Sequence, residues 1–178
     1  MLICDVDCNI LACNAQYPGS VHDSAIWRVS DIKNFLRNEY ENGDITSHLL
    51  GDSGYGLEPW LFTPFNRVVA GTPEARFNEL HKLTRNVIER TNGILKGRFR
   101  CLLRHRVLHY HPAKAAYIVY AAAVLHNIAT WANLDIDEDD IVLNDNDENI
   151  GHRNILEEDN MLHLGRAARA MYIRQNIL

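Results

Sequence analysis

The sequence predicts one mixed α/β domain. Strand-like segments come first, helical segments follow, and one strand-to-helix alternation lies between them. The 178 residues suffice for a domain with its own core, and the composition is that of a globular protein. No apolar run is long enough to span a membrane, and the first residues do not resemble a secretory signal. We expect a domain over 1–130, an acidic linker over 131–160, and a short helix or tail over 161–178.

The first elements are a predicted hairpin. Residues 1–5 and 10–16 are strand-like, residues 7–9 suit a turn, and Tyr17-Pro18-Gly19 ends the second strand. The four cysteines are few and unevenly spaced, which is typical of reduced thiols in an intracellular protein and not of a disulfide framework.

Two short helices and two short strands should follow the hairpin. Residues 20–23 match the capping-box pattern and should open a helix that carries Ile26 and Trp27. Asp31 is expected to cap a second helix, with Ile32, Phe35 and Leu36 on one face. The sequence then indicates a turn over 42–44, a strand over 47–50 and a short strand over 61–65.

The second half of the chain predicts helices. Thr72, Pro73 and Glu74 form a helix start, and apolar residues then recur at helical spacing as far as Phe99. Pro112 should start another helix, over 113–132, which is apolar nearly all round and therefore predicted to be buried, with His126 and Asn127 as satisfied core residues. Residues 162–177 predict a last short helix containing Arg166, Arg169 and Arg174.

Charge is distributed unevenly along the chain. The formal net charge is −5, yet residues 74–114 carry ten Lys or Arg against three Glu, a local net of +7. Residues 131–160 carry eleven Asp or Glu against one Arg, a local net of −10. The basic block suits a polyanion such as nucleic acid, and the acidic block suits a solvated linker.

Two carboxylates are candidates for metal chemistry. Asp52 lies at a strand end between Gly51 and Gly54, and Glu89 lies on a polar stripe of the long helix with Arg85, Asn92 and Lys96. A strand-end acid and a helix-face acid can converge to bind Mg²⁺, which prefers oxygen ligands. Turn chemistry alone also accounts for Asp52, and an ordinary i,i+4 pair with Arg85 also accounts for Glu89.

Several segments together resemble the PIF/Harbinger family of DDE transposases and the nucleases derived from them. In family order over about residues 1–130, they are CDVD (4–7), YPGSVHDSAI (17–26), LLGDSGYGLEPWLFTPF (49–65), NELHKLTRNVIERTNGILKGRFRCL (78–102) and VLHNIA (124–129). The resemblance implies that 1–130 is part of an RNase H-like DDE endonuclease domain, followed by C-terminal helices. It further implies that Asp52 of GDSGY is the second catalytic acid and Glu89 of VIER the third, both binding Mg²⁺ or Mn²⁺ for attack on DNA phosphodiesters.

One part of the family pattern has no counterpart. The family's first catalytic Asp lies in a D-G-T-H-like segment on the first, central strand, and no such segment occurs in this sequence. We therefore expect an RNase H-like core without its first strand, from a truncated or decayed copy that is inactive as it stands. Asp5 or Asp7 could be a substitute ligand, although both also suit a turn. His22 and Asp23, in a segment the family shares, are candidates for supporting the site or simply for capping a helix.

The basic stripe suggests contacts with DNA phosphates. The candidates are Arg85, Arg90, Lys96, Arg98 and Arg100, with Arg104 and Arg106 further along the same block. A solvated helix face is the alternative. The resemblance implies a nuclear location, with a cytoplasmic one also open, and a separate Myb-like DNA-binding partner; a homo-oligomer is a further expectation. A second hypothesis is a non-catalytic, domesticated remnant that binds DNA or a partner protein.

Two further patterns in the sequence resemble functional sites. Cys101, His105 and His109 are spaced by four, as zinc ligands on a helix could be, with His111 nearby, but a fourth ligand is not clearly paired. Residues 51–54 are similar to the nucleophile segment of trypsin-like proteases. They do not form a G-x-S-x-G elbow, and the helical second half contradicts a double β-barrel.

Overall fold

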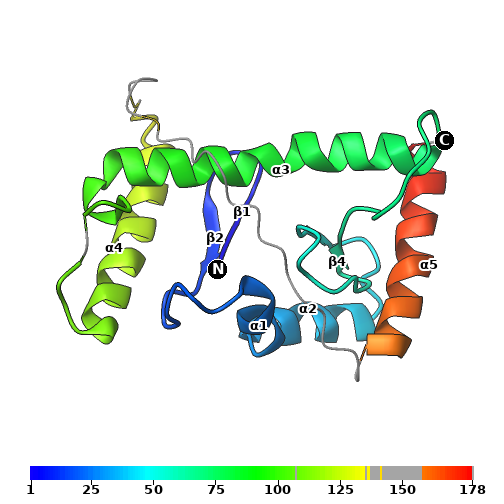
Figure 1. Ribbon diagram of the computed structural model, residues 1–178, viewed down its shortest axis with the longest axis horizontal. Coiled ribbons are helices and arrows are strands. Elements are labelled where there is room, and N and C mark those ends of the chain that lie inside the picture. Colours follow the sequence, from blue (N-terminus) through cyan, green and yellow to red (C-terminus); the bar gives the residue numbers. More distant parts are fainter. Residues whose placement is uncertain (107, 135, 137–140, 142–157, 178) are drawn as a thin grey trace. The chain divides into compact units, whose positions relative to one another are not determined.

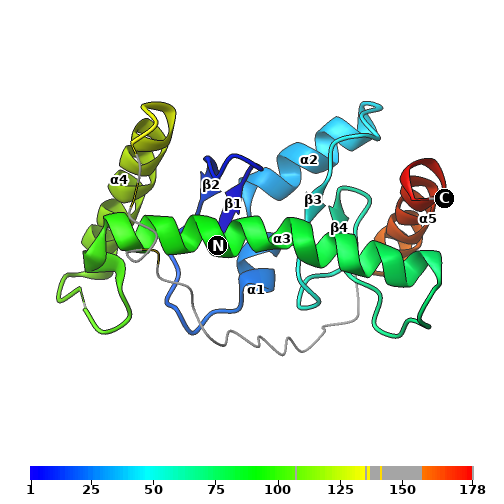
Figure 2. The same cartoon turned by 90° about the horizontal axis from the view of Figure 1, so that it is seen from above.

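The chain folds into two compact units. The computed structural model describes residues 1–106, 108–134, 136, 141 and 158–177. The first unit comprises Met1–Val21 and Asn86–Asp147, and the second comprises His22–Arg85 and Glu148–Leu178. The boundary falls within one continuous helix, α3 (Pro73–Arg98), which is the longest helix in Figures 1 and 2. Short strands and helices together confirm the predicted α/β class.

The hairpin of the first unit was predicted correctly. Strands β1 (Leu2–Cys4) and β2 (Ile10–Cys13) pair antiparallel. The second strand ends at Cys13 and is therefore shorter than the predicted 10–16. The carboxylate of Asp5 accepts hydrogen bonds from the backbone N–H groups of Asp7 and Asn9 at 3.0 and 2.9 Å. These bonds close the turn. Asp5 therefore has the turn role that the sequence also allowed for it.

Helix α4 (Pro112–Trp131) completes the core of the first unit. The side chain of Asn127 accepts from the N–H of Ile10 at 2.8 Å and donates to the C=O of the same residue at 2.9 Å, as a neighbouring strand would. His126 has no exposed surface, and its Nε2 lies 2.8 Å from the C=O of Cys8. His126 is thus a core residue as predicted, but it is bonded only through Nε2, because its buried Nδ1 has no hydrogen-bond partner among the described residues. Asn127 is satisfied as predicted, but it is half-buried and not part of the core. The apolar core around these contacts comprises Ile10, Leu95, Ala122 and Ala123, with Leu2, Cys13, Phe99 and Leu102 packed against it.

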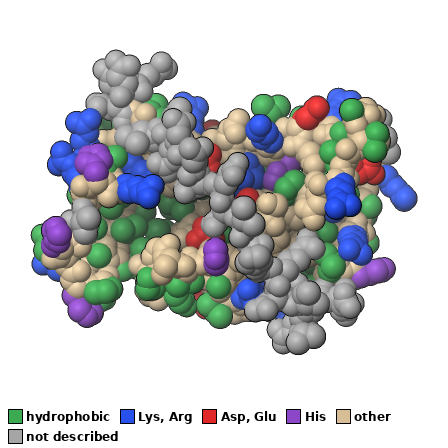
Figure 3. All heavy atoms as spheres, in the orientation of Figure 1, with side chains coloured by type: hydrophobic (Ala, Val, Ile, Leu, Met, Phe, Trp, Pro, Cys, Tyr) green, Lys and Arg blue, Asp and Glu red, His purple; other side chains and the backbone are tan. Residues whose placement is uncertain are grey.

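The predicted burial of α4 was wrong for one face of the helix. Its buried residues are Ala116, Ala122, Ala123 and His126. The opposite face is exposed, with Tyr117 72% and Trp131 71% accessible. In Figure 3, apolar side chains reach the surface in the region of α4. An all-apolar sequence gives no periodicity from which the packed face could be chosen, so only the contact with β2 selects it.

In the residues that the structure describes, the second unit holds four helical segments and a small parallel sheet. Helix α1 (Asp23–Arg28) and helix α2 (Asp31–Glu41) are followed by strands β3 (Leu49–Leu50) and β4 (Leu61–Phe62), by the first half of α3, and by α5 (Glu158–Asn176). Strands β3 and β4 pair parallel, with Leu49 opposite Leu61. The final helix begins before the predicted residue 162, and the predicted linker over 131–160 falls largely outside the described residues.

Two predicted caps in this unit were wrong. The N-cap of α1 is His22, without a side-chain cap bond, so the capping box over 20–23 does not form. The N-cap of α2 is Ser30, whose hydroxyl accepts from the N–H of Lys33, and Asp31 is the first helical residue. Phe35 is 56% exposed, so the expected apolar face of α2 is buried only at Leu36. By contrast, the predicted start of α3 is confirmed, because the Thr72 hydroxyl accepts from the N–H of Ala75 at 3.3 Å.

The core of the second unit is aromatic and depends on α5. Phe62 of β4, Phe77 of α3 and Tyr172 of α5 lie in edge-on or tilted ring contacts, with centroids 5.8 Å apart for Phe62 and Tyr172. Gly165 lets α5 come close, since a Cβ there would lie 3.0 Å from the backbone carbonyl carbon of Glu58. Backbone atoms cannot yield as a flexible side chain can, so a residue without a side chain is required at this point.

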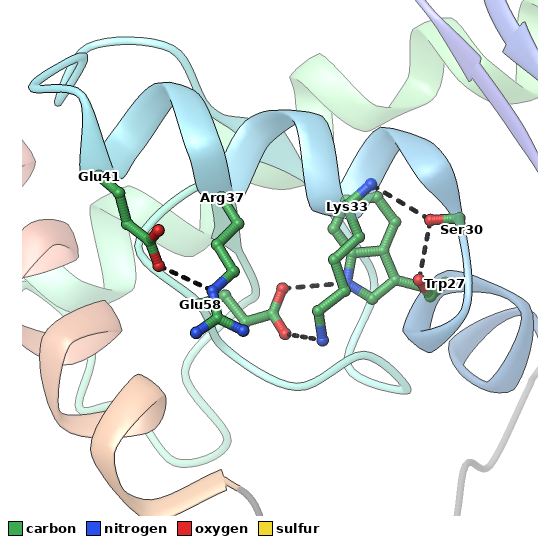
Figure 4. A network of polar contacts seen from close by, with 6 residues as sticks. All are labelled: Trp27, Ser30, Lys33, Arg37, Glu41 and Glu58. Atoms are coloured by element: carbon green, nitrogen blue, oxygen red, sulfur yellow. Dashed lines mark hydrogen bonds and ion pairs between the residues drawn. The ribbon is translucent and has the colours of Figure 1, made fainter.

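A buried carboxylate links α1, α2 and the loop before β4 (Figure 4). Glu58 is 8% exposed, and its two oxygens have different partners. Trp27 Nε1–H donates to Oε2 at 3.0 Å, and Lys33 Nζ lies 2.6 Å from Oε1. A buried charge is tolerated when it is paired and hydrogen-bonded, as here. The sequence had not marked Glu58 as a core residue.

Candidate active site

Asp52 lies where the chain leaves β3, as the sequence predicted. Its carboxylate is half-buried, and Oδ1 accepts a hydrogen bond from the N–H of Gly54 at 2.7 Å. The preceding Gly51 makes the close approach expected of it. A Cβ at Gly51 would lie 3.1 Å from the side chain of Leu61 and 3.1 Å from the ring of Tyr55. The turn therefore presents Asp52 with one oxygen held by the backbone.

The second oxygen of Asp52 faces a cation. Arg85 Nη2 lies 4.0 Å from Asp52 Oδ2, and the two side chains are 29% and 35% exposed. An ion pair at this distance and exposure contributes little to stability. Arg85 thus pairs with Asp52. The sequence had predicted it as a DNA contact or as a partner of Glu89. Because the pair is weak, Asp52 Oδ2 keeps most of its capacity to bind another group.

A half-buried tyrosine, Tyr55, brings Asp23 to the same place. Tyr55 is hydrogen-bonded to Asp23, and its ring packs edge-on against Trp27 with centroids 6.4 Å apart. Burial, followed by the negative charges of Asp23 and Asp52, raises the pKa of Tyr55 well above its usual value. Its phenol therefore remains a donor at neutral pH, which orients Asp23. We refer to Asp23, Asp52, Tyr55 and Arg85 as the Asp52 cluster.

Sequence reasoning only partly anticipated this cluster. His22 and Asp23 were weighed as support for the site or as a helix cap. The structure gives Asp23 a hydrogen bond to Tyr55 and makes His22 the exposed N-cap residue of α1. Tyr55 had not been identified, although it lies within the GDSGY segment.

His81 is a second residue that sequence reasoning missed. It is 5% exposed on α3, its Nε2 lies 3.3 Å from the C=O of Phe62, and it also bonds the backbone at Gly51. It therefore ties α3 to both strands of the sheet, directly before Asp52. A polar residue at a helical position between Phe77 and Arg85 carries no signal by which this role could have been recognised.

The two buried histidines predict an acid-sensitive fold. Burial lowers the pKa of His81, with a further contribution from Arg85 and Arg169, and burial also lowers the pKa of His126. The unfolded chain therefore binds protons more readily, so stability is complete above about pH 6.5 and is lost as the pH falls below it. Each histidine should contribute a slope of up to about 1.4 kcal/mol per pH unit.

Urea denaturation at pH 7.5, 6.5, 6.0 and 5.5 checks this prediction. His81→Gln and His126→Gln should each give a shallower pH dependence than the parent chain. The exposed His163→Gln on α5 is the control and should leave the slope unchanged. An unchanged slope in both core variants would contradict the assignment.

Glu89 lies on α3 one helical turn after Arg85. It is exposed and belongs to the first unit, whereas Asp52 belongs to the second. Within the described part of the chain, no ion pair involves Glu89. The i,i+4 pair with Arg85 that was weighed for it is thus not formed.

The other predicted basic residues differ in their surroundings. The guanidinium of Arg98 donates to the C=O groups of His126 and Leu134 and to the hydroxyl of Thr130. Arg98 therefore binds the C-terminal end of α4, where a cation is favourable. Arg90, Arg100, Arg104 and Arg106 are exposed and Lys96 is half-exposed.

The zinc pattern does not form a site in the described residues. Residues 1–106, 108–134, 136, 141 and 158–177 contain no group of three His, Cys, Asp or Glu side chains that could hold a metal ion. Cys101 lies in the short 3₁₀ helix η1 (Arg100–Leu102), so the expected single helical face does not exist. His111 instead caps α4, accepting from the N–H of Ala113 at 3.4 Å.

Among the described helices none is both long and apolar enough to cross a membrane.

Comparison with known proteins identifies relatives of most of the chain. Residues 1–127 match the family model described as DDE superfamily endonuclease. The human protein named "Putative nuclease HARBI1" is 37% identical over 139 residues, which are 76% of this chain and 38% of that protein. The Arabidopsis thaliana protein named "Protein ALP1-like" is 26% identical over 153 residues, which are 80% of this chain and 36% of that protein. The chain thus spans about two-fifths of the length of these curated relatives. No solved structure matches it.

Proposed function

The chain belongs to the DDE superfamily endonucleases, among the Harbinger transposase-derived nucleases, and from this premise we propose that it carries two of the metal-binding carboxylates of a DNA endonuclease, Asp52 and Glu89. The observation that carries the proposal is the position of Asp52. It follows a strand within the matched range, with one oxygen held by Gly54 and the other only weakly engaged by Arg85. Glu89 is included in the proposal because it belongs to the VIER segment and is exposed on α3.

The candidate ligands are of the type that Mg²⁺ or Mn²⁺ prefers, but the described residues bring too few of them together. Carboxylate oxygens are the ligands these ions prefer, and a bound ion would stabilise charge on the phosphodiester oxygens. The described residues offer no group of three such side chains, and the family's first acidic segment has no counterpart among the 178 residues. We therefore propose an RNase H-like core that does not complete its metal site with the residues present, and we derive no cleavage step from it.

Within this proposal, Tyr55 and Arg85 act on Asp52 and not on a substrate. Arg85 Nη2 faces Asp52 Oδ2 at 4.0 Å. Tyr55 holds Asp23 as a second carboxylate of the same cluster. The cluster thus places the carboxylates of Asp23 and Asp52 around Tyr55.

Titration of the chain with Mn²⁺ tests the assignment, with affinity measured by calorimetry. Asp52→Asn and Glu89→Gln should each weaken Mn²⁺ binding by about tenfold or more, because each removes a charged ligand. The matched controls are Asp31→Asn on α2 and Glu79→Gln on α3, both at exposed positions. They should bind Mn²⁺ like the parent chain. Equal affinities in all five proteins would remove Asp52 and Glu89 from the site.

A second candidate function is a non-catalytic DNA- or partner-binding remnant. The local net charge of +7 (10 − 3) over residues 74–114 favours it. We propose Arg90, Lys96 and Arg100 as the phosphate contacts, because their side chains are exposed or half-exposed within the basic block. The nucleus as location, a Myb-like partner and a homo-oligomer belong to the same proposal.

DNA retardation and cleavage assays separate the two functions. A nuclease would cut DNA in Mg²⁺ but not in EDTA, and Asp52→Asn would abolish the cutting. A binding remnant would retard DNA with a steep salt dependence in EDTA, and Asp52→Asn would leave the retardation unchanged. Cleavage that persists in both Asp52→Asn and Glu89→Gln would overturn the site.

A further inference from the structure

A cleft of about 580 Å³ opens in the second unit beside α5. Its volume is within the range of pockets that hold small organic ligands. Helix α5 lies outside residues 1–127, so the family match assigns it no role. The lining combines an apolar wall with arginines of α5, and the residues used below are Phe65, Leu162, Arg166, Arg169, Ile173 and Arg174.

Arg169 is a buried residue of the cleft lining. It is 7% exposed, its guanidinium carbon lies 3.6 Å from the ring centroid of Phe65, and it donates to the C=O of Thr63. Its Nε is also buried and has no hydrogen-bond partner. Among the described residues, no carboxylate pairs with it. Burial, with a contribution from Arg166, lowers the pKa of Arg169 to about 10, so it is still a cation at neutral pH.

A buried cation without a counter-charge is unfavourable, and the surroundings add to the positive charge. Arg166 and Arg174 are exposed residues of the lining, about two turns apart on α5. Pro73 and Glu74 also line the cleft, so the first turn of α3 contributes the positive end of its helix dipole. Glu74 is the one acidic residue of the lining, so three arginines and one glutamate leave a net charge of +2 (3 − 1).

We propose that this cleft binds a phosphomonoester, with the phosphoryl group held by Arg166 and Arg174 above Arg169 and its organic carrier on the apolar wall. A phosphomonoester is close to dianionic at neutral pH, which matches the charge of the lining. Arginine binds phosphate oxygens through paired N–H donors. Phe65, Leu162 and Ile173 supply an apolar surface that an inorganic ion would leave uncovered. The carrier is a nucleotide, either free or at the end of a DNA strand, and this choice of carrier rests on the proposed function.

Calorimetry in EDTA with the full chain tests the proposal. The probes are deoxyadenosine 5′-monophosphate, deoxyadenosine, and a four-nucleotide DNA strand with and without a 5′-phosphate. We expect the two phosphorylated probes to bind at least about tenfold more tightly than their unphosphorylated counterparts. Arg166→Ala and Arg174→Ala should each cost about tenfold in affinity for these probes. Tighter binding of the strand identifies a DNA end as the source, and equal binding identifies a free nucleotide.

Two further variants keep the test independent of folding and of the metal site. Arg28→Ala removes an exposed arginine of α1 in the same unit and should leave binding unchanged. Asp52→Asn should also bind normally, because no metal is present, so a failure of the proposed metal site would not affect this result. The proposal is overturned if phosphorylated and unphosphorylated probes bind alike, or if Arg166→Ala and Arg174→Ala bind like the Arg28→Ala control.

Discussion

Replacing Glu58 by alanine is expected to lower the free energy of unfolding by about 3–5 kcal/mol. Glu58 is the shared acceptor for Trp27 Nε1–H and the Lys33 ammonium group, at 3.0 and 2.6 Å. Its removal leaves a buried indole N–H without a partner and a cation whose side chain is only 21% exposed. Breaking a buried pair on one side is more costly than replacing both partners by apolar groups, because the remaining charge stays desolvated.

Urea denaturation followed by circular dichroism measures this effect. Glu58→Gln should be less destabilising than Glu58→Ala, because the amide oxygen can still accept from Trp27 while the charge on Lys33 is lost as a partner. The control is Glu41→Ala, which removes an exposed i,i+4 pair with Arg37 and should change stability by no more than about 0.5 kcal/mol. A Glu58→Ala protein as stable as the Glu41→Ala control would show that the buried pair contributes nothing.

Replacing Asn127 by alanine is the second large effect, a loss of about 2–4 kcal/mol. The Asn127 amide bonds both the N–H and the C=O of Ile10, so alanine leaves two backbone groups of β2 without partners. Each part-buried group loses its bond and recovers water only incompletely. Because the same bonds hold α4 on the hairpin, the loss should be seen in the first unit.

The same denaturation experiment, combined with amide hydrogen exchange, checks this prediction. Exchange protection should fall at Ile10 and along β2. Asn127→Asp retains the acceptor for the Ile10 N–H but places a negative charge against the Ile10 C=O, so it should also be destabilising. Asn38→Ala, at an exposed position on α2, is the control and should be nearly neutral. Unchanged protection of β2 in Asn127→Ala would refute the role of this side chain.

The sequence by itself determined the local features. The start of α3 at Thr72 and Pro73 and the start of α4 at Pro112 depend on a cap or on the fixed backbone of proline, and both were predicted correctly. The turn that joins β1 and β2 was predicted for the same reason, since Asp5 bonds the next backbone groups along the chain. The family was also recognisable, because its motifs are contiguous segments in a conserved order, and the comparisons confirm it.

Local competition explains the two caps that were predicted wrongly. Ser30 and Asp31 are neighbours, and both side chains can cap a helix; the structure uses Ser30. Residues 20–23 match the capping-box pattern, but α1 begins only at Asp23, the last residue of that pattern. In both cases the pattern indicated a helix start correctly, but not the residue that caps it.

Only the tertiary structure decided which residues are buried and which polar groups meet. Glu58 finds Trp27 and Lys33 across 31 and 25 residues (58 − 27 and 58 − 33), and Arg169 finds Thr63 across 106 residues. The packed face of α4 and the hydrogen bond between His81 and the C=O of Phe62 likewise depend on elements distant in sequence. Periodicity and capping act over one or two helical turns, whereas these contacts form only when separate elements pack together, so no local pattern specifies them.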